Sequence, residues 1–372
     1  MSDIEKDKTS LIPLANQGLT ARSTNLVRRG LDSLKRKEGR VVHFPASYSI
    51  GKYLLSEYDV WEHDVDFAKE AQGDIFIPLD MKLGLWIESD SSLLALANLN
   101  LDSLVFLSCR GISDNSLVYL ESLTSLDELH IYGNKISNNG LYNLKDLTSL
   151  KSLSLYGNNI SDEGLIHLQR LTSLKSLELS SNKISDIGLA HLGEMSSLGI
   201  LDLFDNNITA GGLVHLQGLS SLTFLNLSCN NICGEGLSNL QGLTSLKYLS
   251  LYCTNIMDED LIHLRGLKAI TWLDLSNNNI TDEGLAHLQG LASLESLNLG
   301  RNYISGEGLV HLQGLASLKV LDLSDSNITD EDSIYLRALT SLKSLSLYKN
   351  NISNEGLALL REWLPECSFC FY

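Results

Sequence analysis

The chain has 372 residues, of which 44% are hydrophobic and 20% charged, and its formal net charge is −17. This composition is typical of a folded, soluble protein, and the acidity argues against a nucleic-acid partner, because binding nucleic acid requires clustered positive charge. No stretch of 18 or more apolar residues occurs, so we expect no membrane span and no membrane partner.

The N-terminus and the cysteines indicate the compartment. The chain starts MSDIEKDKTS, which lacks the apolar core of a signal peptide. Its six cysteines are irregularly spaced, which argues against a disulfide framework. We therefore expect a cytoplasmic protein, or an effector secreted without a classical signal peptide.

Residues 1–72 differ from the rest of the chain. Residues 1–42 contain nine Lys/Arg and five Asp/Glu, whereas the remainder contains 19 and 40 and so has a net charge of −21. Residues 20–40 have the pattern of a basic amphipathic helix. We interpret 1–72 as a mostly helical accessory or cap segment.

From residue 73 onward the sequence repeats every 24 residues, and one unit, 147–170, reads LTSLKSLSLYGNNISDEGLIHLQR. Leu153 and Leu155 alternate as in a strand, whereas Leu165 and Leu168 have a helical spacing. A serine followed by two acidic residues separates the two patterns, as at a helix N-terminus. Each unit therefore predicts a short strand, a turn and a helix of about two to three turns.

The unit resembles a leucine-rich repeat. The pattern L-x-x-L-x-L-x-x-N-x-I occurs as Leu150, Leu153, Leu155, Asn158 and Ile160. The resemblance implies an α/β leucine-rich-repeat solenoid with parallel strands on the concave face and short helices on the convex face. The 24-residue length and the N-x-I-S-D-E-G-L segment also resemble the repeats of some bacterial proteins, including the GALA effectors of plant pathogens.

This resemblance covers about residues 99–372. Strands pair about 4.8 Å apart, whereas helix axes need about 8–10 Å, so the stack must curve. Stacked repeats also need capped ends. We expect residues 73–98 to form a degenerate first repeat, and 363–372 a short C-terminal cap with Phe369 and Phe371 at strand positions.

An asparagine recurs once in most repeats, and the resemblance implies that it is buried and bonded to neighbouring turns. Two repeats depart from this rule and also lack the glycine of D-E-G: one has Thr254 and Asp260, the other Ser326 and Asp332. We interpret these departures as sequence drift, with locally altered turns as the alternative. The column comprises Asn134, Asn158, Asn182, Asn206, Asn230, Asn278, Asn302 and Asn350.

Histidines also form a column on the predicted helices. Zinc–nitrogen bonds of about 2 Å are incompatible with ligands on helices about 8–10 Å apart, so repeat duplication explains the column better than a metal. The small cluster of His63, Asp64 and Asp66 is interpreted as a solvated face. The column comprises His167, His191, His215, His263, His287 and His311.

The cysteines and glycines give little sign of chemistry. Cys229 and Cys253 occupy one column in adjacent repeats and could approach each other, with free thiols as the default. Cys367 and Cys370 form a lone C-x-x-C, which is weak evidence for zinc. The glycines of D-E-G are attributed to the turn. We predict no catalytic residues, no metal, no cofactor and no enzymatic activity.

The strand positions whose side chains face outward vary between repeats. Aromatic residues cluster in the central repeats and acidic or amide residues flank them, a combination typical of binding hot spots. The alternative is that strands favour aromatic residues, whose stacking stabilises the sheet. The candidate partner-binding residues are Glu178, Asp202, Phe204, Asp205, Phe224, Asn226, Tyr248, Tyr252, Trp272, Asp274, Asn298 and Asp322.

These patterns predict a protein–protein interaction module. We expect a monomer that binds another protein with a basic or mixed surface, and its bacterial resemblance suggests an effector that acts on host proteins. The alternative is an adaptor in which residues 1–72 recruit a second component, such as a ubiquitin-ligase subunit, while the repeats select the target. An enzyme with its site in 1–72 is disfavoured, because that segment lacks a catalytic constellation.

Overall fold

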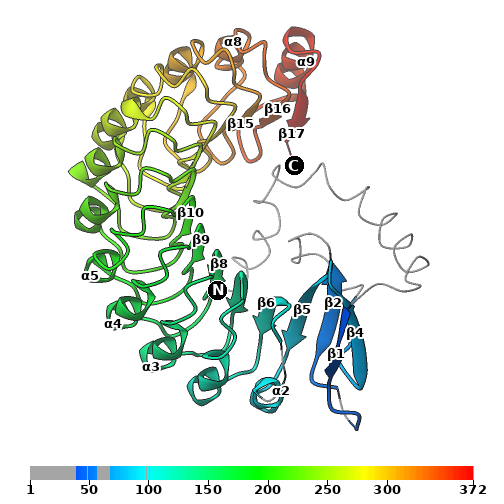
Figure 1. Cartoon of the computed structure of the whole chain (residues 1–372). Coiled ribbons are helices and arrows are strands. Elements are labelled where there is room, and N and C mark those ends of the chain that lie inside the picture. The colour runs from blue at the N-terminus through cyan, green and yellow to red at the C-terminus, as the bar shows by residue number, and fades with distance from the viewer. Residues whose placement is uncertain (1–38, 48, 57–67, 98, 100, 372) are drawn as a thin grey trace.

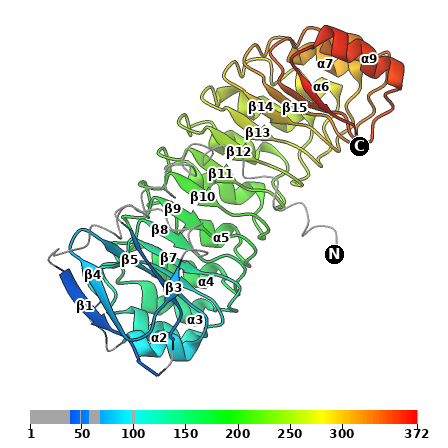
Figure 2. The ribbon, with the colours of Figure 1, turned by 90° about the vertical axis from the view of Figure 1, so that its right-hand side faces the viewer.

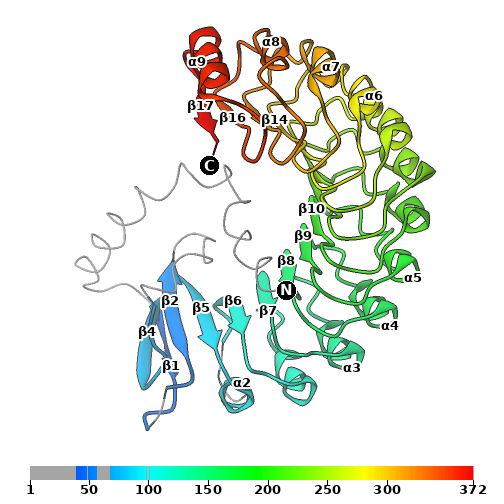
Figure 3. The same ribbon diagram turned by 180° about the vertical axis from the view of Figure 1, so that it is seen from behind.

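The computed structural model describes residues 39–47, 49–56, 68–97, 99 and 101–371. They form an arc whose inner, concave face is lined by strands and whose outer, convex face carries the helices (Figure 1). The reverse view shows the same separation of strands and helices (Figure 3). The predicted curved solenoid is therefore confirmed.

One sheet of 15 strands runs through the described residues, in the order β17 to β5 and then β2 and β3. From β7 to β17 each strand pairs in parallel with the strand 24 residues further on, and Figure 2 shows these strands side by side. The strands of the arc are β5 (Lys82–Ile87), β6 (Leu104–Cys109), β7 (Glu128–Ile131), β8 (Ser152–Ser154), β9 (Ser176–Glu178), β10 (Ile200–Asp202), β11 (Phe224–Asn226), β12 (Tyr248–Ser250), β13 (Trp272–Asp274), β14 (Ser296–Asn298), β15 (Val320–Asp322), β16 (Ser344–Ser346) and β17 (Ser368–Cys370).

The described residues at the N-terminal end form strands. β1 (Gly39–His43) pairs antiparallel with β4 (Asp74–Pro78), and β2 (Lys52–Ser56) pairs antiparallel with both β3 (Lys69–Glu70) and β5. For the described residues of 1–72, the expected helical character is therefore wrong. Their short apolar runs, Val41–Val42 in β1 and Tyr53–Leu55 in β2, suit strands, and β2 covers the edge of the sheet that would otherwise be open.

Two other N-terminal predictions fall mainly or wholly outside the described residues. The basic helix predicted for 20–40 is described only at 39–40, which belong to β1. The cluster of His63, Asp64 and Asp66 is not described at all.

The helices are shorter than predicted. Most repeats have one α-helical turn, a 3₁₀ turn, or one followed by the other. The leucines Leu165, Leu168 and Leu171 are each three residues apart, a spacing that fits the 3.0 residues per turn of a 3₁₀-helix better than 3.6. The α-helices are α2 (Asp90–Leu96), α3 (Asn138–Leu141), α4 (Asp162–Leu165), α5 (Asp186–Leu189), α6 (Asp282–Leu285), α7 (Gly306–Leu309), α8 (Ser333–Leu336) and α9 (Asn354–Trp363). The 3₁₀ turns are η3 (Asp114–Leu120), η4 (Tyr142–Leu144), η5 (Ile166–Leu168), η6 (Ala210–Leu216), η7 (Glu235–Leu240), η8 (Asp258–Gly266) and η9 (Val310–Leu312).

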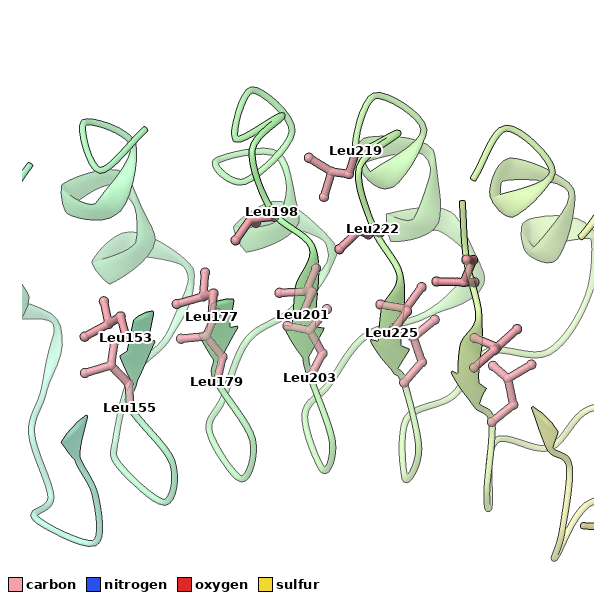
Figure 4. Close-up of a cluster of buried hydrophobic side chains, with 14 of the residues drawn as sticks. Leu153, Leu155, Leu177, Leu179, Leu198, Leu201, Leu203, Leu219, Leu222 and Leu225 are labelled. Carbon is pink, nitrogen blue, oxygen red and sulfur yellow. The ribbon is translucent and has the colours of Figure 1, made fainter. Parts of the chain in front are cut away.

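The core is a continuous set of stacked leucines between the sheet and the convex turns. Leu201, Leu203 and Leu225 are completely buried, and Figure 4 shows equivalent leucines of successive repeats pointing into the same interior. A fully buried leucine side chain contributes about 1.5–3 kcal/mol. Each repeat buries its apolar face only against its neighbours, which is why the stack must continue from end to end.

The asparagine column lies beside this core and bonds to the backbone. Asn278 Nδ2 donates to the carbonyls of Leu251 and Leu275 at 2.7 and 2.9 Å, and its Oδ1 accepts from Ile256 N–H at 3.1 Å. Thr254 keeps part of this pattern, because its hydroxyl donates to the Leu251 carbonyl at 2.7 Å. The hydroxyl of Ser326 is buried and has no hydrogen-bond partner among the described residues.

A second hydrogen-bonded column joins the helix N-termini. Asp162 Oδ1 accepts from the N–H of Ser185 in the next repeat at 2.7 Å, and its Oδ2 accepts from the Ser185 hydroxyl at 2.6 Å. A Cβ atom on Gly188 would clash with this carboxylate. The glycine of D-E-G is therefore required by the close approach of an aspartate, and not by a left-handed turn.

In the two repeats that lack this glycine, the aspartate at the glycine position bonds the residue before the helix of its own repeat. Asp332 Oδ2 accepts from the N–H and hydroxyl of Thr329 in its own repeat, both at 2.8 Å, and the preceding repeat has Gly306 in place of aspartate. Asp260 likewise accepts from Met257 N–H at 3.0 Å and follows a repeat with glycine in the aspartate position. Both departures alter the hydrogen bonds at the start of the helix, which agrees with the alternative interpretation of locally altered turns.

Candidate functional site

Three aromatic rings stack on the concave face. Phe224, Tyr248 and Trp272 are the first residues of β11, β12 and β13, and they pair in register. The ring centroids of Phe224 and Tyr248 lie 4.1 Å apart with an interplanar angle of 11°, and those of Tyr248 and Trp272 lie 3.9 Å apart at 7°. We call this group the aromatic ladder. All three residues are half-buried.

Apolar side chains flank the ladder at the same strand position. Ile200 at the start of β10 is 43% exposed, and Val320 at the start of β15 is 37% exposed. Between Trp272 and Val320 lies Ser296 of β14. The ladder and its flanks form an apolar band across the concave face, and exposed bands of this kind mark contact sites more often than not.

The last residue of β11, β14 and β15 is in each case one of the predicted acids and amides, and its side chain closes the turn that follows the strand. Asp322 Oδ1 accepts from Ser324 N–H at 2.8 Å, Asn298 Oδ1 from Gly300 N–H at 3.1 Å, and Asn226 Oδ1 from Ser228 N–H at 3.0 Å. Such bonds from a side chain to the backbone two residues on are typical of Asx turns. These three residues are only partly buried.

Burial raises the pKa of two aspartates at this strand position, Asp202 and Asp274. Burial raises the pKa of Asp202, whose Oδ1 accepts from Phe204 N–H at 2.9 Å. Asp274 is 2% exposed, and burial raises the pKa of its carboxyl to about 6, although hydrogen bonds from Ser276 act in the opposite direction. The Asp274 side chain therefore stabilises the turn from a buried position, and its burial contradicts its prediction as a contact residue.

The carboxylates also affect the ladder. Burial raises the pKa of the Tyr248 hydroxyl, and the nearby charges of Asp274 and Asp202 raise it further. The phenol is therefore neutral at physiological pH and can act as a hydrogen-bond donor.

The remaining predicted residues lie on the strands and turns beside the ladder. Glu178 at the end of β9 accepts from the Ser154 hydroxyl at 2.6 Å. Phe204 is half-buried and Asp205 is exposed in the turn after β10, where Asp205 has a left-handed φ of 54°. Tyr252 follows β12, and burial is the main cause of its raised pKa.

Sequence reasoning missed a second aromatic cluster at the N-terminal end of the sheet. The rings of Trp86 and Phe106 lie 5.0 Å apart, and those of Phe106 and His130 lie 5.1 Å apart in an edge-to-face arrangement. Phe106 pairs in register with Glu128, only 22 residues further on. A search at a strict 24-residue period therefore passes over it.

The histidine column contributes hydrogen bonds between adjacent repeats on the convex face. His191 Nδ1 bonds Gln169 at 2.9 Å, His311 bonds Gln289 at 2.7 Å, and His287 bonds Arg265 at 2.7 Å. No group of three or more potential metal ligands occurs in the part of the chain that the structure describes.

All six cysteines are free, including Cys229 and Cys253. The thiol of Cys109 is fully buried, and burial raises its pKa. Within the described ranges, no helix combines the length and the apolar character needed to cross a membrane.

Comparisons with known proteins place this arrangement among repeat proteins. Models described as "Leucine rich repeat" match residues 172–232, 270–328 and 338–360, and a model for two copies of the repeat matches 148–191. A search of curated proteins finds no match.

Solved structures give the same result for the fold. An internalin (inlF) from Listeria monocytogenes is 28% identical, with 78% of this chain and 86% of that chain covered and a TM-score of 0.61. An internalin C2 from the same organism is 31% identical over 58% of this chain and 79% of that chain, with a TM-score of 0.41. A plant peptide hormone receptor, solved in complex with its peptide RGF2, is 16% identical over 73% and 59% of the two chains, with a TM-score of 0.36.

Proposed function

The chain is a leucine-rich-repeat protein, and on this premise we propose that it binds a partner protein through the concave face of its sheet. Leucine-rich-repeat solenoids are extended binding scaffolds, and the described residues offer no constellation that suggests catalysis. The observation that carries the proposal is the aromatic ladder, with exposed Ile200 and Val320 on its two sides.

The composition of this surface supports binding. Stacking alone would account for Phe224, Tyr248 and Trp272 as sheet-stabilising residues. It does not account for Val320, which is 37% exposed at the same strand position and is separated from Trp272 by Ser296. An exposed apolar band with rigid aromatic residues at its centre is the usual core of a protein interface.

The charges around the band support a partner with a basic or mixed surface. Asp205 is exposed in the turn that follows β10, and the chain as a whole carries a net charge of −17. Asp325, exposed after β15, already pairs with Arg301 at 3.7 Å. Electrostatic complementarity of this kind mainly raises the association rate and excludes acidic competitors. We further propose that the protein acts as a monomer and as a bacterial effector; its likeness to an internalin supports the second of these.

The proposal is tested by removing the ladder. The variant Tyr248→Ala/Trp272→Ala should lower capture of the partner by tenfold or more, because aromatic anchors at the centre of an interface each contribute about 2 kcal/mol or more. Capture from host-cell and bacterial lysates, followed by mass spectrometry, identifies the partner and measures the loss.

The matched control is Tyr142→Ala/Tyr303→Ala, which removes two aromatic side chains that are 50% and 62% exposed and lie outside the concave strands. This control should leave capture unchanged. If the ladder variant keeps its circular dichroism spectrum and still captures the same partner at the same level, the concave face is not the binding site.

A further inference from the structure

One face of the aromatic ladder is open. Tyr248 stacks between Phe224 and Trp272, so both of its faces are covered. Trp272 has Tyr248 on one side only, and the next strand, β14, carries Ser296 at the equivalent position. Among the described residues no ring or cation is stacked on this second face of the indole.

The space over Ser296 has the dimensions of one further planar layer. Neighbouring strands lie about 4.8 Å apart, so Trp272 and Val320, two strands apart, are separated by about 10 Å at the backbone. The existing rings stack at 3.9–4.1 Å. A planar group at this spacing from Trp272 would have Val320 on its other side. We call the space bounded by Trp272, Ser296 and Val320 the Ser296 gap.

The polar atoms beside the Ser296 gap favour a cation. Asp322 follows Val320 on β15, and its Oδ1 is occupied by the N–H and hydroxyl of Ser324. Its Oδ2 has no hydrogen-bond partner among the described residues. Asn298, on the strand of Ser296, uses its Oδ1 for Gly300 N–H. One carboxylate oxygen is thus available at the edge of the gap.

We propose that the Ser296 gap binds an arginine side chain of the partner, with the guanidinium stacked on Trp272 and paired with Asp322. A guanidinium is planar and weakly hydrated, so it can stack on an indole and bond a carboxylate within the same plane. A lysine ammonium is compact and strongly hydrated, so it fills such a gap poorly. This inference rests on the proposed function and adds the chemical identity of one contact.

The test is an NMR titration of the full chain with Nα-acetylarginine amide, and separately with the corresponding lysine and citrulline compounds, at matched ionic strength. The indole N–H signal of Trp272, assigned by Trp272→Phe, reports occupancy. We expect arginine to bind about fivefold more tightly than lysine, and neutral citrulline to bind least because it has no positive charge to stack on the indole or to pair with Asp322.

Three variants make the test specific. Ser296→Tyr should fill the gap with a fourth ring and abolish the arginine response, whereas Ser176→Tyr at the same position of β9 should not change it. Asp322→Asn should weaken arginine binding to the level of citrulline. Its turn should persist, because Asn226 and Asn298 already serve in that position.

The outcomes separate this inference from the proposed function. Equal responses to arginine and lysine, or an unchanged arginine response in Ser296→Tyr, overturn the arginine assignment. Partner capture that is lost in Tyr248→Ala/Trp272→Ala but unaffected by Ser296→Tyr leaves the concave interface standing without the gap. Capture that survives both variants removes the interface itself.

Discussion

At the scale of single residues, the last residue of several central strands closes the following turn with its side chain, although its charge differs between repeats. Asp274, Asn298 and Asp322 occupy this position in consecutive repeats, and each closes its turn through Oδ1. Only Asp274 is buried, at 2% exposure. Burial disfavours the charged form of a carboxyl, so Asp274 gives the folded protein a pH dependence.

The variant Asp274→Asn should be more stable than the natural protein at pH 7, by about 3 kcal/mol. The folded pKa of Asp274 is about 6, above the unfolded value of about 3.9. The proton that Asp274 holds therefore favours the folded state below about pH 4, and this advantage is lost as pH rises through 6.

Urea unfolding of both proteins at pH 4 and pH 7 checks this sign. The gain of Asp274→Asn should be largest at pH 7 and should shrink toward zero near pH 4. A difference between the two proteins that is the same at both pH values would show that Asp274 has an ordinary pKa.

At the scale of elements, most helix N-termini are completed by a carboxylate, which can come from either of two repeats; Ser161 N–H instead bonds the amide oxygen of Asn138. The aspartate usually belongs to the preceding repeat and needs a glycine beside it, as with Asp162 and Gly188. In the exchanged arrangement, Asp332 supplies the carboxylate from within its own repeat, and Gly306 provides the space. The bond from the N–H before the helix to a carboxylate is present in both arrangements, although a different residue accepts it.

A double-mutant cycle at these two positions tests the exchange. Asp332→Gly should destabilise the protein by about 1–2 kcal/mol, because Thr329 N–H loses its acceptor. Gly306→Asp should destabilise it by about 1–3 kcal/mol, because its side chain would overlap that of Asp332.

The double variant restores the common arrangement and should unfold close to the natural protein. This outcome corresponds to a coupling energy of about 2 kcal/mol or more, measured by chemical denaturation. Additive effects of the two single variants would mean that the two departures arose independently.

At the scale of the whole molecule, the stack is quasi-one-dimensional. The sheet of the described residues runs through all the repeats, yet each strand of the arc pairs only with its two neighbours. Stability in such a stack is a sum of repeat and interface contributions. The same leucine substitution should therefore act differently in the centre and at the end.

Leu249→Ala in β12 and Leu345→Ala in β16 compare equivalent positions of two repeats, and both leucines are completely buried. The central variant should lower the free energy of unfolding by about 3 kcal/mol. The terminal variant should mainly raise hydrogen exchange in β16 and β17, with β8 to β10 unchanged, because local opening at an end breaks only one interface. Uniform exchange in both variants would show that the stack unfolds as one unit.

The sequence predicted most of this architecture, because the repeat imposes the same local choice many times. Leu153 and Leu155 had to face one side of a strand, and Asn158 recurred where the backbone turns. The three-residue spacing of Leu165, Leu168 and Leu171 also indicated a 3₁₀ turn, but it was interpreted as an α-helix. The strands β1 and β2 were not predicted. They lie before the repeats, where no second copy identifies a short apolar run as a strand.

The candidate site was predicted in composition and only partly in arrangement. The sequence alone determined the 24-residue period, the buried leucines and the central position of Phe224, Tyr248 and Trp272, because side-chain periodicity decides which residues share a face. Only the tertiary structure decided that the rings stack, that Asp274 is buried, and that Asp332 replaces an aspartate of the preceding repeat. These features depend on distances of a few ångströms between adjacent turns, which the spacing of residues along the chain does not encode.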